Sequence, residues 1–172
     1  MNHLAGARAR AYLVDGALYL GIAALELPLG LAAIRFGWSS NRTWVHAASA
    51  VAPIVAAVVA ARAEAGPHEA TIGKRREHLK VVAVSPRGRE LRISTASGLV
   101  RNFVKITVPW QLGHVVALGA SRGGFEEGDP PTLVSSALVY PLLGVMAWTG
   151  LRGNGRALHD RAARTRVVST LQ

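Results

Sequence analysis

The sequence predicts an all-α membrane protein with four transmembrane helices and a small cytoplasmic hairpin or clasp between helices 2 and 3. Half of the 172 residues are hydrophobic, and they gather in four long apolar blocks. The 20 lysines and arginines lie mainly between these blocks. This division is typical of a chain whose helices face lipid and whose loops face water.

The four apolar blocks have the length of membrane spans. They cover residues 11–34, 44–61, 103–120 and 133–151. A helix that rises about 1.5 Å per residue needs roughly 20 residues to cross the hydrocarbon core. A soluble helical bundle is the alternative, but its helices would carry a charged stripe, and residues 44–61 contain no Asp, Glu, Lys or Arg. We therefore expect all four blocks to span the membrane.

The first span carries charges that need an explanation. Asp15 lies about 20° around the helix from Arg8, and Glu26 returns to the same angle as Arg8. Tyr12 and Tyr19 lie within about 40° of this stripe. A charge that faces lipid at mid-depth costs at least about 2.5 to 3.5 kcal/mol, so the stripe should turn toward the interior of the helix bundle.

Each predicted span contains one proline, at Pro28, Pro53, Pro109 and Pro141. Proline removes an N–H from its helix, and in lipid the freed carbonyl needs another partner. Broken helices around a site and simple kinking are both compatible with this pattern, and kinking is the more ordinary outcome. Pro28 is expected to kink or end the first helix just after Glu26.

Residues 62–102 are too polar for lipid and are predicted to be cytoplasmic. The stretch LKVVAVSPRGRELRIS has β-branched runs on both sides of residues 85–88, which indicates two short strands or extended arms around a turn. Arg101 and Lys105 follow at i, i+4 on one helix face, where long side chains can reach the headgroup level as interfacial anchors. The candidates for contact with lipid headgroups are Arg75, Arg76, Lys80, Arg101 and Lys105.

The basic residues also predict an orientation. The amino end has two, residues 62–105 have ten and the tail 152–172 has five, whereas the opposite side has three. By the positive-inside rule, both termini and the middle segment are cytoplasmic. The expected partners are therefore the lipid bilayer and its anionic headgroups rather than nucleic acid, because no aromatic stacking pattern accompanies the basic residues.

Four fragments of the chain carry a family resemblance. RARAYLVDG, TIGKRREHLKVV, GRELRISTASGLVRN and LHDRAARTRVV occur in this order around the predicted helices. Together they resemble the RDD family of bacterial membrane proteins, which is named for one arginine and two aspartates. The resemblance covers residues 5–168 as one membrane domain. On this resemblance the family-motif residues are Arg8, Asp15, Gly73, Lys74, Arg101, Asp160 and Arg161.

The resemblance implies a bacterial inner membrane location, whereas it leaves the activity open. Most members of the family have no assigned function, and proposals include sodium/proton antiport. The chain departs from the family pattern at three positions. Ile72 stands where proline is common, and His78 and Arg164 stand where glycine is frequent.

No enzyme motif is complete in this sequence. A phosphate-binding loop would need glycine at His68 and a hydroxyl residue at Arg75. The six histidines lack metal-ligand spacing, so no metal and no cofactor are expected. We therefore expect a protein that is not an enzyme.

Two classes of function remain. The first is ion-coupled transport, with Asp15 as the coupling carboxylate, Glu26 as a second acid, Arg8 modulating the proton affinity of Asp15, and Tyr19 lining the polar face. Four short helices are few for a pathway, so this hypothesis needs a homo-oligomer. The second is a non-catalytic scaffold that binds anionic lipid or a membrane partner protein, in which Asp15 is an ion-pair residue. Asp160 is expected to be a local capping or salt-bridge residue outside the bilayer.

Overall fold

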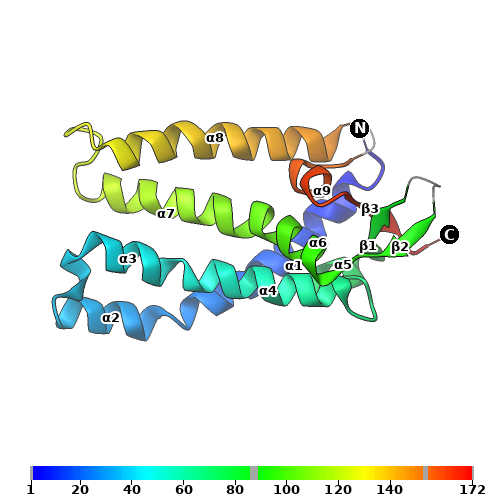
Figure 1. Ribbon diagram of the computed structural model, residues 1–172, viewed down its shortest axis with the longest axis horizontal. Helices are drawn as coiled ribbons and strands as arrows, with labels where there is room; N and C mark the ends of the chain where they lie inside the picture. Colours follow the sequence, from blue (N-terminus) through cyan, green and yellow to red (C-terminus); the bar gives the residue numbers. More distant parts are fainter. Residues whose placement is uncertain (1, 86–88, 153–154, 172) are drawn as a thin grey trace.

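The computed structural model describes residues 2–85, 89–152 and 155–171, and these ranges form a mostly helical protein with one small sheet (Figure 1). In chain order the elements are α1 (Ala5–Ala24), α2 (Leu27–Arg35), η1 (Trp38–Ser40), α3 (Arg42–Ser49), α4 (Val51–Ala65), α5 (Ile72–Arg76), β1 (Leu79–Val84), β2 (Glu90–Arg92), α6 (Thr95–Asn102), η2 (Phe103–Thr107), α7 (Val108–Ala120), α8 (Pro130–Leu151), α9 (Leu158–Ala162) and β3 (Thr165–Ser169).

Three helical stretches are long and apolar enough to cross a membrane, judged by length and composition. They are Ala5–Arg35, Arg42–Ala65 and Pro130–Leu151. The fourth predicted span, residues 103–120, is divided between the π-helix η2 and the 13-residue helix α7. Although α7 lies alongside α8 (Figure 1), the count of four spans stays a prediction.

Prolines mark three of the helix interruptions. A proline ring collides with the carbonyl four residues earlier in an α-helix. Accordingly α1 ends at Ala24, four residues before Pro28, and α3 ends at Ser49, four residues before Pro53. The π-helix η2 lies directly before Pro109 in α7, whereas Pro141 is accommodated inside the continuous helix α8.

The segment between the second and third predicted spans combines with the tail to form a clasp, which we define as α5, the three-stranded sheet and α9. The predicted pairing of two short strands is confirmed, because β1 and β2 are antiparallel with Val82 opposite Arg92. Of the predicted turn at residues 85–88, residues 86–88 lie outside the described part of the chain. The third strand, β3, comes from the tail and pairs antiparallel with the other edge of β1, which the sequence did not predict.

Small residues bring the helices close to one another at the clasp. The buried face of α4 is made of small side chains, namely Pro53, Ala56, Ala57, Ala60 and Ala61. Gly98 of α6 lies against this face, and a Cβ there would stand 3.0 Å from the carbonyl oxygen of Ala61. This close packing places the end of α4 beside α6, where the charged side chains of the candidate site meet.

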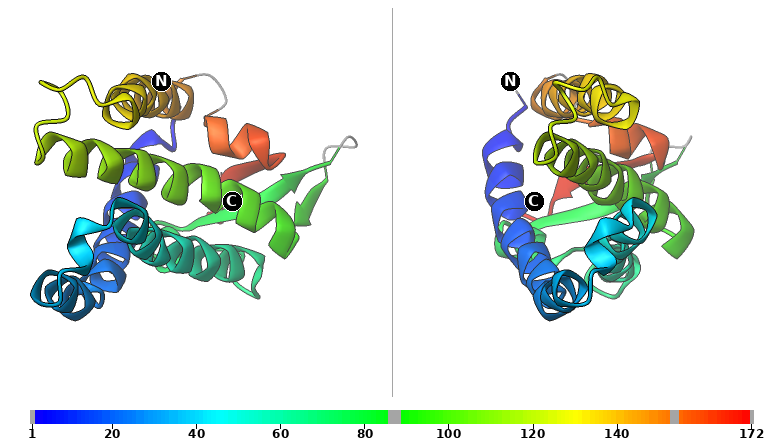
Figure 2. Two further views of the ribbon diagram at one scale, coloured as in Figure 1. Left: turned by 60° about the vertical axis from the view of Figure 1, so that its left-hand side comes forward. Right: turned by 90° about the vertical axis from the view of Figure 1, so that its left-hand side faces the viewer.

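The first helix packs differently from the last two long helices. α7 and α8 run side by side, whereas α1 crosses them obliquely and packs on α4 and α5 (Figures 1 and 2). Large apolar side chains are exposed along α1 and α8, as expected for faces in contact with lipid. They include Leu13, Leu18, Leu20, Leu133, Leu138 and Leu143.

Candidate functional site

Six charged side chains from five elements meet where the helices join the clasp. We call them the ion network: Arg8 and Asp15 of α1, Glu64 of α4, Lys74 of α5, Arg101 of α6 and Asp160 of α9. Three are acids and three are bases, so the network is electrically neutral. The three acids and Arg101 are each no more than 1% exposed. The predicted inward direction of the charged stripe therefore holds for Asp15.

Asp15 is held by α5 and the residue before it. Its two carboxylate oxygens accept hydrogen bonds from the Thr71 hydroxyl at 2.6 Å and from the Gly73 amide at 2.8 Å. The Lys74 ammonium lies 3.7 Å from the same carboxylate. Gly73 is required here by space, since a Cβ at this position would overlap the carbonyl oxygen of Ala11. The Gly-Lys pair thus gives Asp15 both its backbone donor and its nearby cation.

Glu64 occupies the centre of the ion network. It accepts hydrogen bonds from Lys74 Nζ at 2.8 Å, from Asn102 Nδ2 at 2.8 Å and from the Arg101 guanidinium. Sequence reasoning missed Glu64, because it lies beyond the end of the second apolar block. A usable signal was present: Glu64 continues the helical stripe of small residues that ends at Ala60 and Ala61.

Arg101 links Glu64 to the tail. Its Nε donates to Asp160 Oδ1 at 2.9 Å. Burial alone would lower the pKa of Arg101, but the negative charges of Glu64 and Asp160 outweigh burial and raise it, so the guanidinium remains charged. Arg101 is therefore a buried ion-pair residue in this structure, and its side chain does not reach the surface as a contact for lipid headgroups.

Asp160 joins the tail to the first helix. Its Oδ2 accepts a hydrogen bond from Arg8 at 2.9 Å and another from the Ala157 amide at 3.1 Å, at the start of α9. The expected capping role is present, but the ion pairs reach across the fold rather than staying local. Burial would raise the pKa of Asp160, whereas the neighbouring cations, foremost Arg101, lower it below its usual value.

His159 is buried next to this carboxylate, with its Nε2 3.7 Å from Asp160 Oδ2. Burial, followed by the charge of Arg101, holds the pKa of His159 well below 6.5. The imidazole is therefore neutral at physiological pH and adds no charge to the ion network.

The remaining candidates of the predicted polar stripe do not join the network. Glu26 lies at the junction of α1 and α2, eleven residues beyond Asp15, which is about 16 Å along a helix. Tyr19 packs against Ala56, Ala60 and Ile106. Among the described residues neither Glu26 Oε1 nor the Tyr19 hydroxyl has a hydrogen-bond partner. The family-motif residue Arg161 is exposed, and its Nε donates to the carbonyl of Arg156.

The candidate headgroup contacts are divided by burial. Arg75 and Arg76 are exposed at the end of α5, and Lys80 forms an ion pair of 3.2 Å with Glu90. Lys105 is buried at 7% exposure, so it does not reach the surface as a headgroup anchor. The reason is local: η2 turns this side chain into the bundle, where its ammonium lies 5.1 Å from the centre of the Tyr12 ring.

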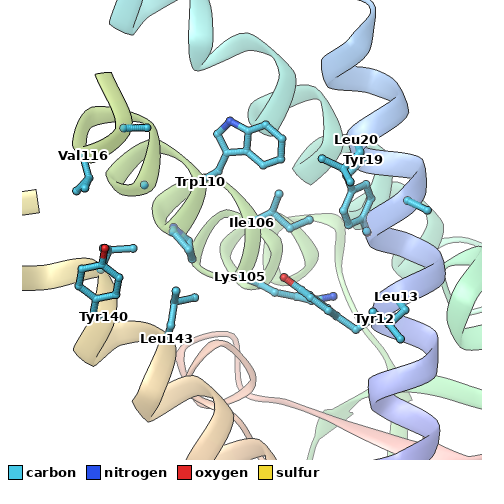
Figure 3. A pocket seen from close by; sticks show the side chains of 16 residues that line it. Tyr12, Leu13, Tyr19, Leu20, Lys105, Ile106, Trp110, Val116, Tyr140 and Leu143 are labelled. Carbon is cyan, nitrogen blue, oxygen red and sulfur yellow. The ribbon is translucent and has the colours of Figure 1, made fainter. Parts of the chain in front are cut away.

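Lys105 lines two cavities. A cavity of about 80 Å³ lies within the ion network and is also bordered by Asp15, Lys74 and Arg101. A second cavity of about 780 Å³ lies between α1, η2, α7 and α8 (Figure 3). In Figure 3 Lys105 and Tyr12 lie at one end of this cavity, and Trp110 and Val116 lie further along α7. We call it the inter-helix cavity.

Metal binding has no obvious place in this arrangement. Within the described ranges, no three side chains of His, Cys, Asp or Glu are grouped so that they could hold a metal ion. The ion network can instead join five separate segments through charge-assisted hydrogen bonds.

Comparison with known proteins gives one match. The model of the RDD family matches residues 4–164, a range that includes every member of the ion network. No curated protein and no solved structure matches the chain.

Proposed function

This chain belongs to the RDD family, and from that premise we propose that it is a non-catalytic scaffold of the bacterial inner membrane. In this proposal the ion network locks the clasp to the helices on the cytoplasmic side. The clasp then holds exposed cations at the membrane surface, where they bind anionic lipid headgroups or a membrane partner protein.

The observation that carries the proposal is that each acid of the ion network already has its partners. Asp15, Glu64 and Asp160 each accept at least two hydrogen bonds, and each lies within 4 Å of a cation. Partners of this kind hold a carboxylate in one position, as in a structural ion pair, rather than leaving it free to bind and release an ion. They support a role in holding the clasp.

The position of α5 supports contact with headgroups. Gly73 packs against the backbone of α1 at Ala11, which lies at the first turns of an apolar span. The exposed side chains of Arg75 and Arg76 follow directly, at the level where a span meets its interface. Each such cation near an anionic surface contributes about 1 kcal/mol of attraction.

Hydrogen exchange in nanodiscs tests this proposal. Backbone amides of α5 should exchange more slowly in nanodiscs that contain phosphatidylglycerol than in nanodiscs of phosphatidylcholine alone. High salt, or the double variant Arg75→Gln/Arg76→Gln, should remove the difference because both weaken the attraction. The matched control is Arg161→Gln/Arg164→Gln, which removes two exposed cations from the tail instead. Equal exchange of wild-type α5 in both lipids would contradict the proposal.

Ion-coupled sodium/proton transport by a homo-oligomer is the second candidate. Two observations favour it: the cavity of about 80 Å³ beside Asp15, which has room for water, and the unpartnered carboxylate oxygen of Glu26 within the described ranges. Purified protein in sealed vesicles should then show a sodium-dependent change of internal pH that Asp15→Asn abolishes. A wild-type protein that is silent at every pH would reject transport and leave the scaffold.

A further inference from the structure

The inter-helix cavity has no part in the proposed function. It exists because α1 packs on α4 and α5, whereas α7 packs on α8, so the two helix pairs diverge. Its volume is about 780 Å³, within the range of small-molecule and lipid sites. Of the described residues that line it, Lys105 is the sole charged one, and tyrosines supply most of the other polar groups.

Lys105 is a buried base that has no acidic partner among the described residues. The ion network pairs three acids with three bases, and Lys105 adds a fourth base with no described carboxylate within ion-pair distance. Asp15 and Glu64 attract it at longer range, but Lys74 and Arg101 repel it. A buried charge of this kind is costly unless a counter-charge reaches it. A negatively charged group could approach Lys105 through the inter-helix cavity.

The shape of the cavity fits a hydrocarbon chain. From Lys105 to Ala117 its wall follows twelve residues of helix, or about 18 Å, which exceeds the roughly 15 Å of hydrocarbon in one leaflet. Gly16 of α1 and Gly113 of α7 face this space, and a Cβ at either position would meet no atom within 4 Å. The cavity therefore combines an apolar channel with a cation at one end.

We propose that the inter-helix cavity binds one anionic phospholipid, with an acyl chain along α7 and the headgroup phosphate paired with the Lys105 ammonium. The negative charge of the phosphate would compensate the Lys105 ammonium, which none of the three carboxylates pairs with directly. The Tyr12 ring, which already lies over the ammonium, would close the site toward the bilayer. This site is separate from Arg75 and Arg76, so it goes beyond the scaffold proposal and can stand or fail without it.

Fluorescence quenching by brominated lipids tests the site, because Trp110 lines the cavity (Figure 3). The reporter protein keeps Trp110 and carries Trp38→Phe, Trp44→Phe and Trp148→Phe. It is reconstituted in phosphatidylcholine with increasing fractions of brominated phosphatidylglycerol or, separately, brominated phosphatidylcholine. Half-maximal quenching should need about tenfold less of the anionic lipid, since a hydrogen bond between charged groups commonly contributes that much to affinity.

Two variants separate the charge from the channel. Lys105→Gln keeps the cavity and removes the cation, so both lipids should quench alike. Gly113→Leu keeps Lys105 and extends a side chain into the channel from a position where a Cβ meets no atom within 4 Å, so the anionic preference should also disappear. The matched controls are Lys80→Gln, which removes a cation from the sheet, and Gly144→Leu, which adds the same side chain at an exposed site of α8 outside the cavity. Both controls should keep the preference.

The outcomes divide clearly. Equal quenching of wild-type Trp110 by the two lipids would overturn the proposal, because the cavity would then hold ordinary bilayer lipid. A preference that survives Lys105→Gln would overturn the role of Lys105. Loss of the preference in Lys105→Gln and Gly113→Leu, with both controls unchanged, would establish the site even if the exchange of α5 proved independent of lipid.

Discussion

At the scale of single residues, the ion network removes six charged side chains from most contact with water. Taking a charge out of water costs several kcal/mol, and good ion-pair geometry returns about the same amount. The network therefore adds little net stability as a whole, but losing one member is expensive, because its partners remain buried and unpaired. It specifies one arrangement of α1, α4, α5, α6 and α9 rather than simply strengthening the fold.

Glu64→Gln tests this view at the centre of the network. The amide leaves Lys74 and Arg101 without the carboxylate they share, so the free energy of unfolding should fall by about 3 to 5 kcal/mol. The measurement is the thermal unfolding midpoint of the purified protein in detergent. Glu77→Gln is the control, since it breaks the exposed pair with Arg10 and should shift the midpoint little. Equal shifts of the two midpoints would show that burial does not determine how much stability is lost when an ion pair is broken.

His78 and Arg164 adopt backbone conformations that favour glycine. Their φ angles are 53° and 54°, and both are positions where the family resemblance implies a glycine. For a residue with a Cβ, this left-handed conformation costs about 1 to 2 kcal/mol. Both side chains are exposed, and the backbone hydrogen bonds of the two residues do not depend on them. Among the described residues, neither side chain forms a hydrogen bond or an ion pair that would offset this strain.

Replacing either residue by glycine should stabilise the protein. His78→Gly and Arg164→Gly should each raise the free energy of unfolding by about 0.5 to 1 kcal/mol, because relief of strain exceeds the added flexibility of the unfolded chain. Arg76→Gly, at an exposed helical position of α5, is the control and should destabilise by up to about 1 kcal/mol. The comparison uses unfolding midpoints in one detergent, and a destabilised His78→Gly would contradict the argument.

How far the sequence could predict this site depends on the residue. Arg8, Asp15 and Asp160 are family-motif residues, and helical arithmetic turned Asp15 inward correctly. Glu64 was missed, and Lys105 was predicted to contact lipid headgroups. Both errors arise because the environment of each residue depends on which helices pack together. A periodic pattern gives the face of a residue on its own helix, but the partners on other helices come from tertiary packing.

At the scale of elements, prolines and the tail explain most of the departures from the prediction. Three of the four prolines in the predicted spans lie where helices are interrupted, because the clash with the carbonyl four residues earlier is local, whereas Pro141 lies inside a continuous helix. The third strand could not be foreseen in the same way, because β3 pairs with β1 across about half of the chain. That pairing holds α9 against α6 and α8, where Asp160 and His159 are buried.

The burial of α9 predicts a pH dependence of stability. The pKa of His159 is well below 6.5 in the folded state, because burial and the cations Arg101, Lys105 and Arg8 oppose protonation more than Asp160 favours it. In the unfolded chain the pKa returns to about 6.5, so below that pH the unfolded state binds an extra proton. The contribution of His159 to stability should therefore be constant above about pH 7 and fall as the pH is lowered, at up to about 1.4 kcal/mol per pH unit.

His159→Gln isolates this contribution. The variant keeps a polar side chain of similar size and cannot be protonated, so its unfolding midpoint should change less between pH 7.5 and pH 5.5 than that of the wild type. The difference between the two profiles removes the contribution of the other histidines. Carboxylates with lowered pKa values, among them Asp160, Glu77 and Asp129, do not interfere, because their effect begins only near their unfolded pKa values of about 4. Parallel profiles would contradict the assignment.

At the scale of the whole molecule, the fold limits the topology. Both termini lie at the end that carries the clasp, and the α2–α3 and α7–α8 connections lie at the other end (Figure 1). Three stretches meet the length and hydropathy of a span, yet an odd number of crossings would put the termini on opposite sides. A return through η2 and α7 would place both termini on one side, and this return is the predicted fourth crossing.

Cysteine labelling tests this topology and its orientation together, because the chain has no cysteine of its own. Glu126→Cys, at an exposed site in the α7–α8 connection, should react with a membrane-impermeant maleimide in spheroplasts. Thr170→Cys, exposed in the tail, should react only after the membrane is opened, because the ten basic residues at 62–105 favour the cytoplasm for the clasp end. Reaction of both sites in spheroplasts would mean that α8 does not cross. Reaction of Thr170→Cys alone would invert the orientation, and the basic face of α5 would then meet the outer leaflet instead of the anionic cytoplasmic one.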